Sequence, residues 1–336
     1  MIAPSSAFGP DPQRVEEFDA LMRLRLCDSL RYLHEVSGDR VEIPAAMLEA
    51  GITRLLDHPV SPDAFAAYYE LVYAIQDGHF QPAELLFREI LESPACTGLE
   101  LIPFLDPATD RRSQRYLRPV DSDPDQPFAI QPITTEDFDR ASGLIHQAFD
   151  LLREFDPPLH DEIKALLKTI MIGAGSKDKS ARTFDGASAF ELWGSILLNA
   201  IEAKDIVDMV QTLAHESCHV MLFGYCIDDL LVLNPDSERY PSPLRSDPRP
   251  IDGIFHATFV LARMHYASSV LCEKSRLEPS LIEKADAGRR GFSARFYDGL
   301  ATLKQHARYT DHGKALMANA EAYMNEHALA PPPASR

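Results

Sequence analysis

From Asp11 to about Glu92 the chain carries hydrophobic residues at the three- and four-residue spacing of amphipathic helices. The first run comprises Val15, Phe18, Leu21, Met22, Leu26, Leu30 and Leu33. Further helices are predicted over Ala45–Asp57, Pro62–Gln76 and Pro82–Leu91, because each segment opens with a proline or a capping residue. The pattern therefore predicts a helical N-terminal region.

The segment that follows, Ser93–Pro132, is rich in Pro, Asp and Arg, and it is predicted to be a long irregular connection. Within it, Phe128–Ile133 is the one predicted strand. A helix is predicted to begin at Thr134 and to run to about Phe155. The doublet Pro157-Pro158 is expected to end that helix, because proline cannot continue it.

The middle of the chain changes from helical spacing to short apolar runs that contain glycine. Leu166–Gly175 and Ala187–Leu198 are both predicted to be buried strands, the second folded back near Gly194, and together they suggest a hairpin. Helical spacing then returns, and a long helix is predicted over Ala203–Phe223.

The last third alternates one irregular segment with further helices. Val232–Ile251 contains five prolines and is predicted to be a loop, a length that is uncommon unless the loop is functional or disordered. Helices are predicted over Gly253 to about Lys274 and from Pro279 to about His327. The tail, Ala330–Arg336, is predicted to be disordered.

These elements predict a mostly α (α+β) fold, in which a small β-sheet or hairpin packs beside one long helix. Three regions are expected: a helical region over residues 1–160 that serves as a cap or a peptide-docking surface, a catalytic region over 161–329, and a disordered tail over 330–336.

Composition excludes several classes of partner. The 336 residues include 33 basic and 51 acidic side chains, for a net charge of −18. An excess of acid this large disfavours nucleic acids and anionic membranes as ligands. Five cysteines without a CxxC pair, and no basic or apolar signal sequence near Met1, lead us to expect a cytoplasmic protein.

Candidate chemistry lies in the predicted helix Ala203–Phe223, which contains the sequence His215-Glu216-Ser217-Cys218-His219. Two histidines at positions i and i+4 lie about 40° apart around a helix, one turn along it, so both imidazoles can reach one metal ion. Neutral imidazole binds zinc and iron alike, and the pair alone does not identify the metal.

A third ligand is expected from the next helix, where His256 follows the proline-rich loop. Arg263 lies seven positions later and returns to the same helical face, whereas His265 lies on the opposite face. Placing both His256 and Arg263 on one buried face is costly unless each has a partner.

These residues suit two chemistries. In a zinc hydrolase, Glu216 would be the general base beside His215 and His219, and the third ligand would be His256 or a later residue such as Glu273. In a non-haem iron oxygenase, an arginine would hold the distal carboxylate of a 2-oxoacid through two parallel hydrogen bonds. The arginines placed for that role are Arg245, Arg249 and Arg263.

The HESCH sequence, the loop Tyr240-Pro241-Ser242-Pro243-Leu244-Arg245 with its continuation to Pro250, and the downstream His256 resemble the HExxH-motif family of peptide-modifying proteins. The resemblance covers about Leu166–Leu271 and implies an Fe(II)- and 2-oxoglutarate-dependent peptide β-hydroxylase that acts on a ribosomally made precursor peptide. It implies that His215, His219 and His256 bind iron. It also implies that Arg245 holds 2-oxoglutarate, with Arg249 and Arg263 as alternatives.

Overall fold

Two apolar segments form the centre of a small mixed sheet in the computed structural model, which describes residues 6–121, 127–176, 184–243 and 247–327. The strands are β1 (Glu100–Pro103), β2 (Thr169–Gly173), β3 (Gly186–Ala187) and β4 (Ser195–Asn199). Their order is β1-β2-β4-β3, with β1–β2 and β2–β4 parallel and β3–β4 antiparallel. Every position of β2 and β4 is buried, as expected for central strands in parallel pairing.

The described chain divides into two compact units. One unit comprises residues 15–142 and 164–202 and contains the sheet. The other comprises residues 1–14, 143–163 and 203–336 and contains the HExxH segment.

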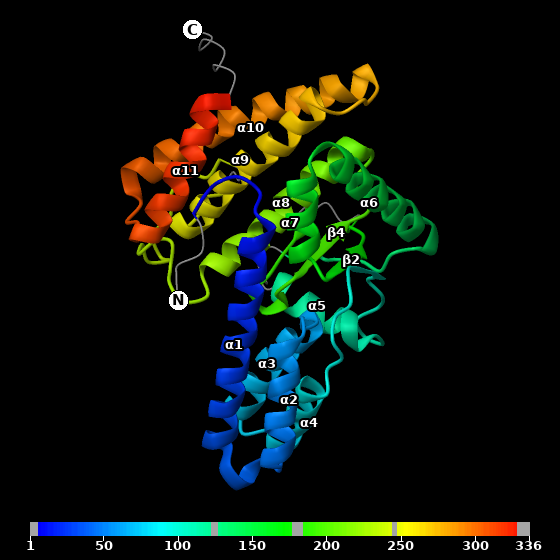
Figure 1. Cartoon of the computed structure of the whole chain (residues 1–336), viewed down its shortest axis with the longest axis vertical. Coiled ribbons are helices and arrows are strands. Elements are labelled where there is room, and N and C mark those ends of the chain that lie inside the picture. Colours follow the sequence, from blue (N-terminus) through cyan, green and yellow to red (C-terminus); the bar gives the residue numbers. More distant parts are fainter. Residues whose placement is uncertain (1–5, 122–126, 177–183, 244–246, 328–336) are drawn as a thin grey trace. The chain divides into compact units, whose positions relative to one another are not determined.

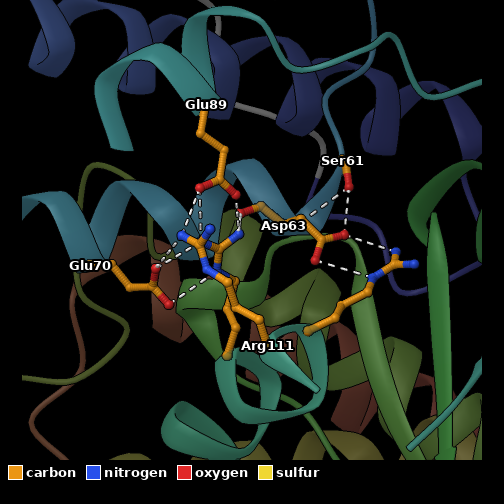
Figure 2. A network of polar contacts seen from close by, with 7 residues as sticks. Ser61, Asp63, Glu70, Glu89 and Arg111 are labelled. Carbon is orange, nitrogen blue, oxygen red and sulfur yellow. Dashed lines mark hydrogen bonds and ion pairs between the residues drawn. The ribbon is translucent and has the colours of Figure 1, made fainter. Parts of the chain in front are cut away.

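The unit that contains the sheet also holds a group of helices. They are most of α1 (Pro12–Ser37), α2 (Ala45–Asp57), α3 (Pro62–Gln76), α4 (Phe80–Leu91), α5 (Arg111–Val120) and the short 3₁₀ helices η1 (Gly38–Arg40) and η2 (Phe190–Leu192). Ser61 caps α3 by accepting a hydrogen bond from the Asp63 amide, and Pro62 occupies the first turn. Arginines of α5 form ion pairs with acids of α3 and α4, and Figure 2 shows Arg111 near the carboxylates of Glu70 and Glu89.

The other unit is a helical assembly centred on a buried helix. Its principal elements are α8 (Ile206–Tyr225), α9 (Ile251–Glu273), α10 (Pro279–His306) and α11 (Asp311–His327), with the C-terminal half of α6 (Thr135–Phe155) and most of α7 (Pro157–Leu166). Helix α9 is buried on most of its faces, and α10 returns alongside it (Figure 1). The sequence predicts the burial of α9.

The predicted fold class, mostly α with a small sheet, is confirmed. The predicted helices Ala45–Asp57 and Pro62–Gln76 match α2 and α3 residue for residue. Within Ala187–Leu198 the chain does fold back near Gly194, whose φ of 82° suits a residue without Cβ. Among the described residues, no helix has both the length and the apolar character needed to cross a membrane.

Other details of the prediction were wrong. The segments around β2 and β4 do not form a hairpin with each other, because those strands pair in parallel. Phe128–Ile133 forms only a single bridge, from Gln131 to Ala174. The segment expected to be irregular contains β1 and α5. Helix α6 does end at Phe155 before the proline doublet, as predicted, but Pro157 then begins a further helix, α7, since proline suits the first helical position. The tail predicted to be disordered lies outside the described residues.

Candidate metal centre

The HExxH sequence lies in the middle of α8, a helix with a well-defined start. The Asp205 side chain accepts hydrogen bonds from the amides of Val207 and Asp208, which satisfies two of the free donors at the helix N-terminus. The apolar residues of α8 are buried on several faces, so the helix is fixed within its unit. This setting holds His215 and His219 one turn apart, as the sequence predicts.

The two histidines of α8 turn the same ring nitrogen toward each other. The Nε2 atoms of His215 and His219 lie 3.2 Å apart. Two imidazole nitrogens that bind one tetrahedral metal ion at about 2.05 Å are separated by roughly 3.3 Å. The spacing of this pair therefore fits one shared ion.

The far side of the His215 ring contacts a sulfur atom of α9. Nδ1 of His215 lies 3.2 Å from Sδ of Met264. A thioether can only accept a hydrogen bond, so Nδ1 carries the proton and donates it, and Nε2 keeps its lone pair. Met264 thus orients the ring in the tautomer that a metal ligand needs.

His256 approaches His219 from the opposite side. The Nδ1 atoms of His219 and His256 lie 3.3 Å apart, and the two rings are nearly parallel at 17° with their centroids 5.6 Å apart. The two nitrogens of the His219 ring therefore face different partners, Nε2 toward His215 and Nδ1 toward His256. In the part of the chain that the structure describes, no group of three or more His, Cys, Asp or Glu side chains is arranged to hold a metal ion.

Burial keeps two histidines of this cluster, His219 and His256, neutral. Burial, followed by the neighbouring His215 and His256, holds the pKa of His219 well below its ordinary value. Burial likewise lowers the pKa of His256. In the neutral form His219 can donate its Nδ1 proton to Nδ1 of His256, which leaves the Nε2 lone pairs of His215 and His219 facing each other. Neutral imidazole is also the form that binds a metal.

The two residues of the motif next to His215 and His219 are buried and differ in reactivity. The Glu216 side chain is buried, and its Oε1 lies 3.8 Å from Nε2 of His215. A carboxylate at that position can reach a water molecule beside the histidine pair. Burial raises the pKa of the Cys218 thiol to about 12, so this cysteine stays protonated and is unsuited to bind a metal.

Arg263 belongs to a buried ion cluster. Its Nη2 lies 3.0 Å from Oε1 of Glu162 on α7, and Nη2 of Arg14 lies 2.6 Å from Oε2 of the same carboxylate. The exposed fractions of the three side chains are only 3%, 6% and 1%. The sequence gives no sign of this partnership, because Glu162 is 101 residues from Arg263.

In this group, which we call the Arg14–Glu162–Arg263 cluster, the two guanidinium groups share the Glu162 carboxylate. Although burial acts in the opposite direction, the Glu162 carboxylate and also the Asp11 carboxylate raise the pKa of Arg14. In the described part of the chain, Nη1 of Arg263 and Nε of Arg14 are buried and have no hydrogen-bond partner. Buried donors normally find acceptors, and a buried donor without one is costly. Each of these two donors could therefore still take an acceptor.

The other two arginines predicted to bind a co-substrate are placed differently. Arg249 forms an ion pair with Asp247 at 2.9 Å, and its backbone pairs with Tyr240 through two hydrogen bonds. Both members of that ion pair are partly exposed, so it is a weak surface interaction. Arg245 lies outside the described residues.

No protein-family model matches this chain, and no curated protein is significantly similar to it.

Proposed function

We propose that this protein is an Fe(II)- and 2-oxoglutarate-dependent peptide hydroxylase whose metal centre is built on α8. The observation that carries the proposal is the 3.2 Å separation of the His215 and His219 Nε2 atoms on one buried helix. The resemblance of the HESCH segment and the proline-rich loop to the HExxH-motif family of peptide-modifying proteins supports the choice of reaction.

In this proposal the side chains of the chain have separate tasks. His215 and His219 would bind the ion through Nε2, and His256 would hold the ion or fix the His219 ring. Bound Fe(II) would supply redox chemistry with dioxygen, in which 2-oxoglutarate is converted to succinate and carbon dioxide and one oxygen atom enters a peptide C–H bond. Met264 orients His215, and the surrounding apolar residues limit access of water.

The Arg14–Glu162–Arg263 cluster supports an anionic co-substrate. Arg263 lies seven residues from His256 on the same face of α9, about 10.5 Å along the helix axis. The unpaired Nη1 donor of Arg263 would bind the distal carboxylate of 2-oxoglutarate. Arg249 would need to leave Asp247 first, which costs little because that pair is partly exposed.

The proposal is tested by anaerobic loading with Fe(II) and calorimetric titration with 2-oxoglutarate, followed by exposure to air and measurement of succinate. We expect one iron per chain, and 2-oxoglutarate binding that Arg263→Gln weakens at least about tenfold, the effect of losing a charge-assisted hydrogen bond. Arg263→Lys keeps the charge and serves as the variant for comparison if the glutamine variant folds poorly. Iron-loaded protein that neither binds 2-oxoglutarate nor forms succinate contradicts the proposal.

One observation favours a second candidate, a zinc-dependent hydrolase. The Glu216 carboxylate lies 3.8 Å from Nε2 of His215, where it could remove a proton from a metal-bound water molecule. Zinc bound tightly as purified, together with peptide cleavage that Glu216→Gln abolishes and 2-oxoglutarate does not affect, would establish this alternative.

A further inference from the structure

A cavity of about 330 Å³ lies in the unit that contains the sheet, between α3, α5 and η2. Its charged and aromatic lining comprises Tyr69, Glu70, Tyr73, Arg115, Arg118 and Glu191. This volume falls at the lower end of the range for small-molecule sites. None of these residues belongs to the metal centre described above.

One wall of the cavity is rigid because its charges are already paired. Arg115 is buried, and it donates to Glu70 at 3.0 and 2.8 Å and to Glu89 at 2.6 and 3.3 Å. Figure 2 shows Glu70 and Glu89 turned toward the same group of arginines. Because Arg115 is already paired with two carboxylates, this wall of the cavity has a fixed shape. Arg115 therefore does not need a ligand as its partner.

Two other charged side chains of the cavity, Arg118 and Glu191, have no ion-pair partner among the described residues. Within the described ranges neither side chain forms an ion pair or a hydrogen bond, although Arg111, Arg112 and Arg115 on the same helix are all paired with acids. The Arg118 guanidinium lies 4.5 Å from the centre of the Tyr73 ring, which holds it in place by a cation–π contact. The site therefore offers one positioned cation and one carboxylate.

Tyr69 and Tyr73 line the cavity with apolar rings, each of which ends in a polar hydroxyl group. Burial, together with the neighbouring Tyr68 and the Glu191 carboxylate, raises the pKa of Tyr69, so its hydroxyl stays neutral and can donate a hydrogen bond. Tyr69 and Glu191 line the same cavity. Tyr73 also lines the cavity and is 40% exposed.

We propose that this cavity binds a small zwitterion of the α-amino acid or short-peptide class. The ligand carboxylate would pair with Arg118, whose planar guanidinium matches a carboxylate through two hydrogen bonds. The ligand ammonium would pair with Glu191, and an aromatic or aliphatic side chain would lie against Tyr69 and Tyr73. This inference does not depend on the proposed hydroxylase activity.

The test uses three probes of similar shape in calorimetric titrations of the full chain. L-Phenylalanine carries both charges, 3-phenylpropionate only the carboxylate, and 2-phenylethylamine only the ammonium. We expect L-phenylalanine to bind at least about tenfold more tightly than either single-charge analogue. Arg118→Gln should remove the advantage over 2-phenylethylamine, and Glu191→Gln should remove the advantage over 3-phenylpropionate.

Such a ligand could be a free amino acid or a segment of a peptide chain. A blocked tripeptide, acetyl-Glu-Phe-Lys-amide, distinguishes these two sources because its charges lie only on side chains. Tripeptide binding that is tighter than phenylalanine binding and sensitive to Arg118→Gln supports the proposal with a peptide segment as the ligand. Arg153→Gln, which removes an arginine of α6 outside the cavity, should change nothing. The proposal fails if no zwitterionic probe binds at about 10 mM, or if both cavity variants bind as the unmodified protein does.

Discussion

The three histidines of the candidate centre differ in the ring nitrogen that each presents. His215 and His219 face each other through Nε2, whereas His256 meets the Nδ1 atom of His219. Histidines that bind metals usually donate their second nitrogen to a neighbouring group, which fixes the ring and strengthens the ligand. His256 lies where such a neighbour of His219 would lie. The change in metal affinity when His256 is removed therefore distinguishes a metal ligand from a residue that only orients His219.

We therefore expect His215→Ala and His219→Ala to abolish tight Fe(II) binding in anaerobic competition with a chelator. If His256 orients His219, His256→Ala should weaken binding by only about 10–100-fold, because the pair on α8 is retained. His146→Ala, at an exposed position on α6, is the matched control and should bind normally. A loss in His256→Ala as complete as that in His219→Ala would instead make His256 the third ligand.

His265 lies on the opposite face of α9 from His256, and its environment predicts a pH dependence. Its Nδ1 lies 2.9 Å from the Tyr323 hydroxyl, and burial, followed by the charges of Arg289 and His327, lowers its pKa to about 4. The unfolded chain takes up a proton below about pH 6.5, but the folded chain does so only near pH 4. The free energy of unfolding should therefore decrease as the pH falls from 6.5 to 4.

Between pH 7 and pH 5 the contribution of His265 amounts to about 2 kcal/mol. His265→Gln should reduce the pH-dependent loss of stability by about that amount, as measured by urea unfolding at the two pH values. Comparing the change between pH values, rather than the absolute stability, removes the effect of the lost Tyr323 contact. Equal pH dependence in His265→Gln and the unmodified protein would contradict the prediction.

At the scale of elements, the close approach of α10 to α9 depends on a glycine. A Cβ atom added at Gly299 would overlap Oγ1 of Thr258 and press on Pro243, whereas nothing lies within 4 Å of a Cβ added at Gly291 of the same helix. The Thr258 hydroxyl donates to the Ile254 carbonyl at 2.7 Å, so it cannot move away without losing that bond.

The two glycines predict opposite results for the same substitution. Gly299→Ala should lower the free energy of unfolding by about 1–3 kcal/mol, because the two helices must separate. Gly291→Ala should raise it by up to about 1 kcal/mol, because alanine has the higher helix propensity. Denaturant titration of both variants measures the contrast, and equal effects in the two would show that α9 and α10 adjust freely.

The sequence predicts those elements whose signal is local. The bounds of α2 and α3 follow from hydrophobic spacing and from the prolines and capping residues at their starts. Strand β1 and helix α5 are not predicted from the sequence, because β1 is only four residues long and α5 is rich in arginine. The ion-pair partners of the arginines in α5, such as Glu70 and Glu89, lie elsewhere in the chain and not next to α5 in the sequence.

The same distinction applies to the candidate site. The pairing of His215 with His219 can be predicted from the sequence because one helix holds both residues, and their spacing along it is a local property. The contact of Met264 with His215 and the binding of Glu162 to both Arg14 and Arg263 join residues far apart in the sequence. Such partners carry no local pattern and become visible only in the folded chain.

At the scale of the whole molecule, a net charge of −18 opposes the approach of any anion. A dianionic co-substrate would therefore need a local group of positive charge that surface acids and salt do not screen. The Arg14–Glu162–Arg263 cluster meets that need because its side chains are almost fully buried. The acidic composition thus favours a buried anion site over one on the exposed loop around Arg249.

A metal cation bound to the folded chain but not to the unfolded chain stabilises the whole molecule by mass action. At a free metal concentration about 100 times the Kd, the gain is about 2.7 kcal/mol, and chelation should remove it. We expect a chelator to lower the melting temperature of metal-loaded protein and to reduce hydrogen-exchange protection in α8 and α9. His215→Ala should melt at the same temperature with and without chelator, because it lacks one of the paired Nε2 atoms. A chelator effect that persists in this variant would place the metal at a site other than the HExxH helix.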